Sequence, residues 1–191
     1  QEVKAYFSEA RVLDGLFGII GKLFGVTIEP TPATLWHADA RFWTVRRHGQ
    51  PVAQFYTDLY AREGKRGGAW MADIRARRQL ADGSVQIPVA LLTCNFTAPV
   101  GDKPALFTHD EVITLFHEFG HGLHHMLTEV DELGVSGING VEWDAVELPS
   151  QFMENWCLHR PTLMNMAIHY QTGEVLPDEL YQKLRDAKTY R

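Results

Sequence analysis

Residues 108–127 read THDEVITLFHEFGHGLHHML, and this stretch decides how the rest of the chain is interpreted. A threonine followed three residues later by a glutamate matches a capping box, so we expect a helix to begin here. On that helix His117 and His121 are four residues apart, so their imidazole rings project from one face. Glu118 is turned by about 100° from His117 and lies beside this face. The stretch is therefore an H-E-x-x-H zinc pattern, with two histidine ligands and a glutamate placed as general base.

The third protein ligand that a catalytic zinc ion usually has must come from outside this pattern. We expect a second helix, from about Trp143 to His159, to return beside the first, because glycines in the intervening loop let the chain reverse. Pro149 indicates that this helix starts near Leu148 or is kinked there. A polar stripe at steps of three and four residues offers three candidate carboxylates, Asp144, Glu147 and Glu154. Of these, Glu147 is the best placed.

Two further residues could assist the site. Asp144 could hold a ligating histidine through its second ring nitrogen, and helix capping explains this residue equally well. His124 lies seven residues after His117 on the same face, where it could contact the ligands or the substrate. A packed or solvated histidine is an equal alternative there. For His125 we favour the non-functional interpretation, a packed or solvated histidine. Zinc suits this ligand set best, and cobalt or manganese could occupy the same site.

Outside the zinc pattern, hydrophobic periodicity predicts an N-terminal helix, a small sheet and a helical C-terminal part. The expected helices cover about residues 2–24, 70–78, 162–170 and 178–189, and the expected strands cover 41–47, 52–60 and 86–96. The first two strands flank residues 48–51, and we expect them to form a hairpin. The apolar run in the last strand predicts burial on both of its faces. We therefore expect an α+β fold, mainly α with a small inserted β-sheet. It would form one unit over residues 1–191, with a helix and the sheet in 1–107 and the helical zinc-binding portion in 108–191.

The composition excludes several function classes. The chain has 191 residues, of which 45% are hydrophobic, and its net charge is −6. An acidic chain without a basic cluster is expected to bind nucleic acid poorly. No apolar run reaches the 18 residues that a membrane-spanning helix needs. Cys94 and Cys157 are too few for a disulfide scaffold and suit a reducing compartment, and we expect both to be small buried hydrophobic residues. No secretory signal is visible. Because the chain starts with Gln1 and ends abruptly at Arg191, we expect it to be a fragment.

A basic turn with the sequence GKRGG lies upstream of the zinc pattern, at residues 64–68. Arg62, Lys65 and Arg66 in and beside this turn could meet a peptide carboxylate. A solvated basic turn is the interpretation that we favour.

Longer motifs carry a family resemblance. HEFGHGLHHML at residues 117–127 is followed by ELPSQFMENW at 147–156, and DLYAREGKRGGAW and LLTCNF stand upstream at 58–70 and 91–96. Over essentially its whole length the chain resembles the thimet oligopeptidase family of zinc peptidases. The resemblance implies one zinc ion with His117, His121 and Glu147 as ligands, and Glu118 as the catalytic carboxylate. It also implies that LLTCNF is a strand near the cleft whose backbone can receive an extended peptide.

The resemblance further implies a larger, mainly helical, two-lobed and cytoplasmic protein that cleaves short peptides, and we expect that protein to be monomeric. The family also has a Tyr- and His-rich segment that polarises the scissile carbonyl, and no such pattern follows residue 156. We therefore weigh two alternatives to a zinc-dependent endopeptidase. The first is a non-catalytic zinc- or peptide-binding fragment, and the second is an interaction module that uses open apolar faces.

Overall fold

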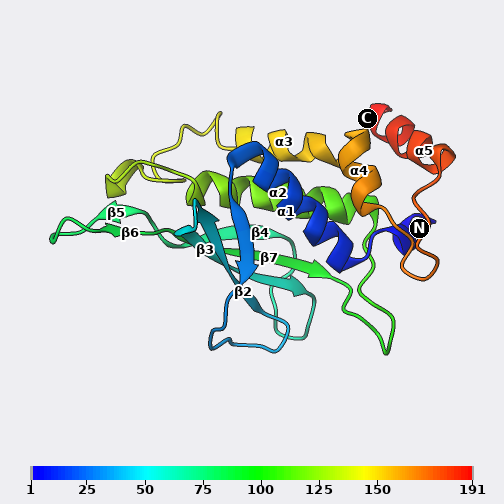
Figure 1. The fold of residues 1–191 in the computed structure, drawn as a ribbon, viewed down its shortest axis with the longest axis horizontal. Helices are drawn as coiled ribbons and strands as arrows, with labels where there is room; N and C mark the ends of the chain where they lie inside the picture. Colours follow the sequence, from blue (N-terminus) through cyan, green and yellow to red (C-terminus); the bar gives the residue numbers. More distant parts are fainter. Residues whose placement is uncertain (1, 191) are drawn as a thin grey trace.

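The computed structural model describes residues 2–190 and has an α+β fold, as expected. Figure 1 shows helices α1, α2 and α3 lying on one side of a sheet, with α2 between the sheet and α3. The elements are, in chain order, α1 (Glu9–Phe24), β1 (Thr27–Pro30), β2 (Arg41–Arg47), β3 (Gln50–Tyr60), β4 (Trp70–Arg75), β5 (Arg78–Gln79), β6 (Val85–Gln86), β7 (Val89–Phe96), α2 (His109–Met126), α3 (Leu148–Glu154), α4 (Arg160–Met166) and α5 (Asp178–Thr189). Short 3-10 turns cover Lys4–Tyr6, Leu133–Val135 and Asn155–Cys157. Within residues 2–190, no helix combines the length and the apolar character that crossing a membrane requires.

The sheet is larger than the sequence suggested. Five strands lie in the order β1-β2-β3-β7-β4, and β5 and β6 form a separate two-stranded ribbon. The expected hairpin is confirmed, since β2 and β3 pair antiparallel across a two-residue turn. His48 and Gly49 in that turn both have positive φ, 51° and 75°, which matches the twist of the flanking strands. β3 and β7 pair in parallel, so the sheet is mixed.

The helix expected near Trp70–Arg78 is wrong, because this segment forms β4. Trp70 pairs with Thr93 and Asp73 with Ala90 in an antiparallel ladder with β7. The ladder overrides the helical preference of the segment's Met, Ala and Arg side chains. As a consequence β7 has a strand on each side, and its burial on both faces is confirmed. LLTCNF was expected to receive a peptide along its backbone, but its first three residues, 91–93, already pair with β4, and the free edge on this side of the sheet belongs to β4.

The first helix begins seven residues later than expected, at Glu9. The backbone before it pairs with the segment that leads into α2: Phe107 N donates to Phe7 O at 2.8 Å, and Glu9 N donates to Ala105 O at 3.0 Å. These bonds replace the helical ones that residues 2–8 would otherwise make. α1 ends at Gly25, as expected, in a left-handed conformation with φ 66°.

The core lies between the helices and the inner face of the sheet. Phe17 of α1 contacts Trp43 and Phe55 edge to face, and Phe55 contacts Phe119 of α2 at 5.3 Å between ring centroids. Phe55 and Phe119 are fully buried. Buried aromatic side chains of this size contribute a large share of core stability. Helix α2 is thus held against the sheet by a side opposite to His117 and His121.

α2 begins where its capping box predicts. Thr108 Oγ1 accepts from Glu111 N at 3.1 Å, and Glu111 Oε1 accepts from Thr108 N at 2.9 Å. The second helix is shorter than expected, because residues 143–147 are turns and α3 begins at Leu148. Pro149 has no N–H to donate, so it fits the first turn of α3 and not a helix interior. Of the last two expected helices, 162–170 is displaced to Arg160–Met166 and 178–189 is confirmed as α5.

Candidate metal centre

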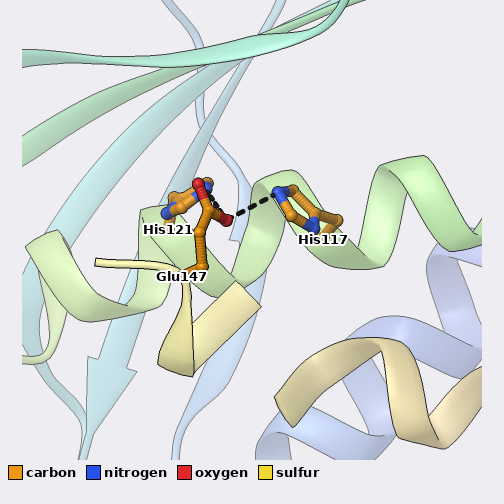
Figure 2. Close-up of side chains that lie close together, drawn as sticks. All are labelled: His117, His121 and Glu147. Atoms are coloured by element: carbon orange, nitrogen blue, oxygen red, sulfur yellow. Dashed lines mark ion pairs between the residues drawn. The ribbon is translucent and has the colours of Figure 1, made fainter. Parts of the chain in front are cut away.

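Three of the expected ligands meet at one point. His117 and His121 project from α2, and Glu147 stands at the residue that caps α3, with its carboxylate between the two rings (Figure 2). Glu147 Oε2 lies 3.2 Å from Nε2 of each histidine. The ligand atoms of these three residues all lie within 4.8 Å of one another. Within the described residues this is the one such group of three or more potential metal ligands.

The geometry and the donor types fit a zinc ion. Zinc bonds to histidine nitrogen and carboxylate oxygen are about 2.0–2.2 Å long, and a tetrahedral arrangement then separates the donors by about 3.4 Å. The two observed 3.2 Å separations are close to that value. The rings of His117 and His121 lie at 80° to each other with centroids 4.9 Å apart, so they do not stack. Their side chains are 26% and 16% exposed, which leaves room for a further ligand from solvent.

His117 is held from its other side by Glu154. Its Nδ1 lies 2.6 Å from Glu154 Oε1, and both side chains are 26% exposed. A carboxylate at Nδ1 makes that nitrogen the donor and leaves Nε2, which faces Glu147, free to bind a metal. Lys188 Nζ lies 3.8 Å from the other oxygen of Glu154. Glu154 belongs to the polar stripe expected from the sequence, seven residues after Glu147, but it was expected there only as a possible metal ligand.

Glu147 is itself held by Ser150. The hydroxyl of Ser150 lies 2.7 Å from Glu147 Oε2 and 2.9 Å from Glu147 O. This hydrogen bond is the main cause that lowers the pKa of the Glu147 carboxyl, and the two histidines lower it further. The carboxylate is therefore ionised, as a metal ligand must be. Ser150 was not among the residues expected at the site. It stands three residues after Glu147 at the start of a helix, a spacing at which side chains commonly contact each other.

Glu118 is 7% exposed and neighbours the three clustered residues. Burial raises the pKa of its carboxyl, the nearby His117 lowers it, and Glu147 raises it again. For His121, burial lowers the pKa, and Glu147 opposes that shift. The neutral imidazole that a metal requires is thus the favoured form of His121.

The structure does not bring the other two expected residues into the cluster. Asp144 lies in an exposed turn before α3, and within the described chain its carboxylate makes no hydrogen bond or ion pair. The helical spacing that linked it to Glu147 does not apply, since α3 starts after it. His124 lies on the expected face of α2, and its buried Nδ1 has no hydrogen-bond partner in residues 2–190. His125 is fully buried, with Nε2 2.8 Å from Arg75 O.

Two of the three basic residues, Arg62 and Lys65, are engaged within the protein, whereas Arg66 is exposed and its guanidinium lies over the Trp70 ring. Arg62 makes two hydrogen bonds to Asp58, at 2.7 and 2.8 Å. The side chain of Lys65 is 6% exposed, and its Nζ donates to Asp58, Tyr60 O and Cys94 O. The preference for a solvated turn is therefore wrong for both residues. The buried cysteines are as expected, and burial raises the pKa of the Cys94 thiol to about 12.

Comparison with known proteins identifies peptidases as the relatives of this chain. A family model described as Peptidase family M3 matches residues 1–191. Oligopeptidase A of Escherichia coli (strain K12) is 55% identical over 193 residues, which are 100% of this chain and 28% of that protein. The organellar oligopeptidase A, chloroplastic/mitochondrial, of Arabidopsis thaliana is 54% identical over 198 residues, 100% of this chain and 25% of its own. Thimet-like oligopeptidase of Dictyostelium discoideum is 38% identical over 192 residues, 97% of this chain and 28% of its own. The chain thus spans roughly a quarter of the length of these relatives.

Proposed function

The chain belongs to peptidase family M3, and from that membership we propose that it supplies the catalytic zinc centre of an endopeptidase that hydrolyses short peptides. The observation that carries the proposal is the convergence of His117, His121 and Glu147 on one point, with zinc-compatible donor separations. In this proposal α2 is a zincin-like active-site helix. Residues 1–191 act as one catalytic unit, in which 1–107 supply α1 and the sheet and 108–191 supply the metal ligands.

The chain's own residues divide the work. A zinc ion bound here supplies Lewis acidity toward the scissile carbonyl and activates a water molecule. Glu118 takes the proton of the attacking water and passes it to the leaving amine. The raised pKa of the Glu118 carboxyl supports this role, because a base with a pKa nearer to neutral also becomes an effective acid. Glu154, rather than Asp144, orients His117 through its Nδ1.

The substrate is proposed to lie along β4. This strand is at the edge of the five-stranded sheet, and its partner β7 lies on one side only. A free edge offers backbone N–H and C=O groups that an extended peptide can pair with. The C-terminal end of β4 is tied to α2 by the contact between Arg75 O and His125 Nε2. A peptide on this edge would therefore run beside the helix that carries the metal ligands.

The compartment proposed for the protein is the cytoplasm. The two cysteines are free and buried, which supports a reducing, cytoplasmic compartment. The partners proposed are short peptides, and the active protein is proposed to be a monomer. The net charge of −6 gives no support to nucleic-acid binding.

Replacing Glu118 by Gln tests the central assignment. The variant should keep one zinc per chain, measured by atomic emission, because Glu118 is not a ligand. It should lose hydrolysis of an internally quenched peptide by at least about 100-fold, because general base catalysis contributes about 10²–10⁴-fold. Loss of zinc in this variant would instead assign Glu118 to the ligand set and refute the proposed base.

A second experiment separates the enzyme from the binding module. The unmodified chain is incubated with zinc and the quenched peptide, and the assay is repeated with a chelator. Turnover that the chelator abolishes supports the peptidase. Stoichiometric zinc without turnover supports the non-catalytic zinc- or peptide-binding alternative.

A further inference from the structure

Ser150 is fully buried directly beneath the third ligand. Its exposed fraction is 0%, and its hydroxyl lies 2.7 Å from Glu147 Oε2. That oxygen is the same atom that lies 3.2 Å from Nε2 of both His117 and His121. A carboxylate oxygen has two lone pairs, so one can accept from Ser150 while the other binds a metal.

Gly120 makes this position of Ser150 possible. A Cβ atom on Gly120 would lie 2.4 Å from Ser150 Cα and 2.5 Å from Pro149 O, both backbone atoms that cannot move aside. Gly120 stands between the two histidines of the zinc pattern, so the close approach of α3 to α2 occurs beside the ligands. A larger residue would push the start of α3, and Glu147 with it, away from the histidines.

We propose that Ser150 is a positioning residue for the third ligand, and that Gly120 is the residue that permits it to act. The Glu147 side chain is 50% exposed and belongs to the turn before α3, so packing alone does not fix its rotamer. The hydrogen bond from Ser150 selects the rotamer in which Oε2 faces the histidines. The zinc site is thereby organised before the metal arrives, which lowers the entropy lost on binding. This inference rests on the proposed zinc centre.

The test is the zinc affinity of Ser150→Ala, measured by competition with a chromophoric chelator. The variant should bind zinc about 10–100-fold more weakly, the range found when a partner of a metal ligand is removed. In a Glu147→Ala background the same substitution should have no further effect, because the hydroxyl then has no carboxylate to orient. A merely structural serine would instead weaken zinc binding equally in both backgrounds, or not at all, and either result overturns the proposal.

Gly120→Ala gives an independent measurement, with Gly122→Ala as its matched control on the same helix. A Cβ atom on Gly122 would meet only side-chain atoms, of Leu92 at 3.2 Å and of Met126 at 3.5 Å, whereas a Cβ on Gly120 meets backbone. Gly120→Ala should weaken zinc binding by at least about 10-fold, and Gly122→Ala by much less. Equal zinc affinities for the two variants would overturn the role given to Gly120. If Gly120→Ala does not fold, the Ser150→Ala comparison still decides the proposal.

The metal centre and the positioning role of Ser150 can be refuted separately. Absence of zinc binding by the unmodified chain, or zinc binding that Glu147→Ala leaves unchanged, refutes the proposed metal centre itself. Zinc binding that depends on Glu147 but not on Ser150 refutes only the positioning role. Melting temperatures of the metal-free variants show whether a loss of affinity comes from unfolding.

Discussion

At the scale of single residues, His117, one of the proposed ligands, has a carboxylate on each side of its ring. His117 faces Glu147 through Nε2 and Glu154 through Nδ1, at 3.2 and 2.6 Å. The second contact fixes both the ring orientation and the position of its proton. Lys188 Nζ lies 3.8 Å from the other oxygen of Glu154 and places a positive charge beside it. A single carboxylate thus decides which ring nitrogen of His117 is available.

Glu154→Gln should weaken zinc binding by about 10-fold, because the amide keeps an acceptor at His117 Nδ1 but removes the negative charge. Glu154→Ala should weaken it more. Both values come from chelator competition, with Glu174→Gln as the control, since Glu174 is exposed and remote in sequence from the cluster. An affinity for zinc that is unchanged in Glu154→Ala would show that His117 is oriented by something else.

At the scale of elements, the site depends on where two helices begin. α2 starts at His109 because Thr108 and Glu111 satisfy each other's backbone N–H groups. α3 starts at Leu148, which leaves Glu147 at the cap and not within the helix. The first start is encoded by residues adjacent in sequence. The second depends on Pro149 and on the close contact of Gly120 with Ser150.

Thr108→Ala should destabilise the chain by about 1 kcal/mol, the usual cost of losing a capping side chain. Thermal or urea unfolding of the metal-free protein measures this loss. Thr114→Ala removes a hydroxyl from the same helix, where it bonds only to Asp110 O, and should cost less. Because the cap lies two turns before His117, zinc affinity of the folded Thr108→Ala protein should stay within about twofold of the unmodified value. A large change in affinity would contradict this separation of stability from binding.

At the scale of the whole molecule, a buried ionic cluster joins the ends of the two parallel strands. Lys65 Nζ donates to Tyr60 O of β3 and to Cys94 O of β7, at 2.7 and 2.5 Å. Asp58 is 4% exposed, and its carboxylate accepts hydrogen bonds from Arg62, Lys65 and Trp36. Burial alone would raise the pKa of Asp58, but these hydrogen bonds outweigh it and hold the pKa well below its usual range. Arg62 and Lys65 are therefore part of the framework that joins β3 to β7.

Lys65→Met should destabilise the chain by about 3 kcal/mol at pH 7, because removal of one partner leaves the buried Asp58 carboxylate and three backbone carbonyls poorly paired. The exposed Lys103→Met is the matched control and should change the stability little. Since the folded-state pKa of Asp58 is lowered, its stabilisation is present above the unfolded pKa of about 3.9 and is lost as the pH falls below it. The difference in melting temperature between the unmodified chain and Lys65→Met should therefore shrink below about pH 4. A difference that is constant from pH 7 to pH 3 would argue against Asp58 as the group involved.

The features whose placement the sequence predicted share one property: their spacing along a single element fixes their geometry. His117, His121 and the cap of α2 needed only the period of a helix and a local hydrogen-bond pattern. The hairpin of β2 and β3 needed only a two-residue turn between two β-rich runs. Errors arose where distant segments compete for the same backbone. β4 became a strand through β7, and residues 7–9 paired with 105–107 instead of extending α1.

The sequence by itself determined the family, the helix that carries the H-E-x-x-H pattern and the types of side chain offered to a metal, because those depend on residue types and on spacing within a few turns. Only the tertiary structure decided which of Asp144, Glu147 and Glu154 faces the histidines, and how. Glu147 faces Nε2 of both rings and Glu154 faces Nδ1 of His117, since α3 starts at Leu148 and approaches α2 closely at Gly120. It also decided that β4 and not β7 has the free edge. Which helix faces meet and which strands pair depends on packing between segments far apart in sequence, and no local pattern encodes it.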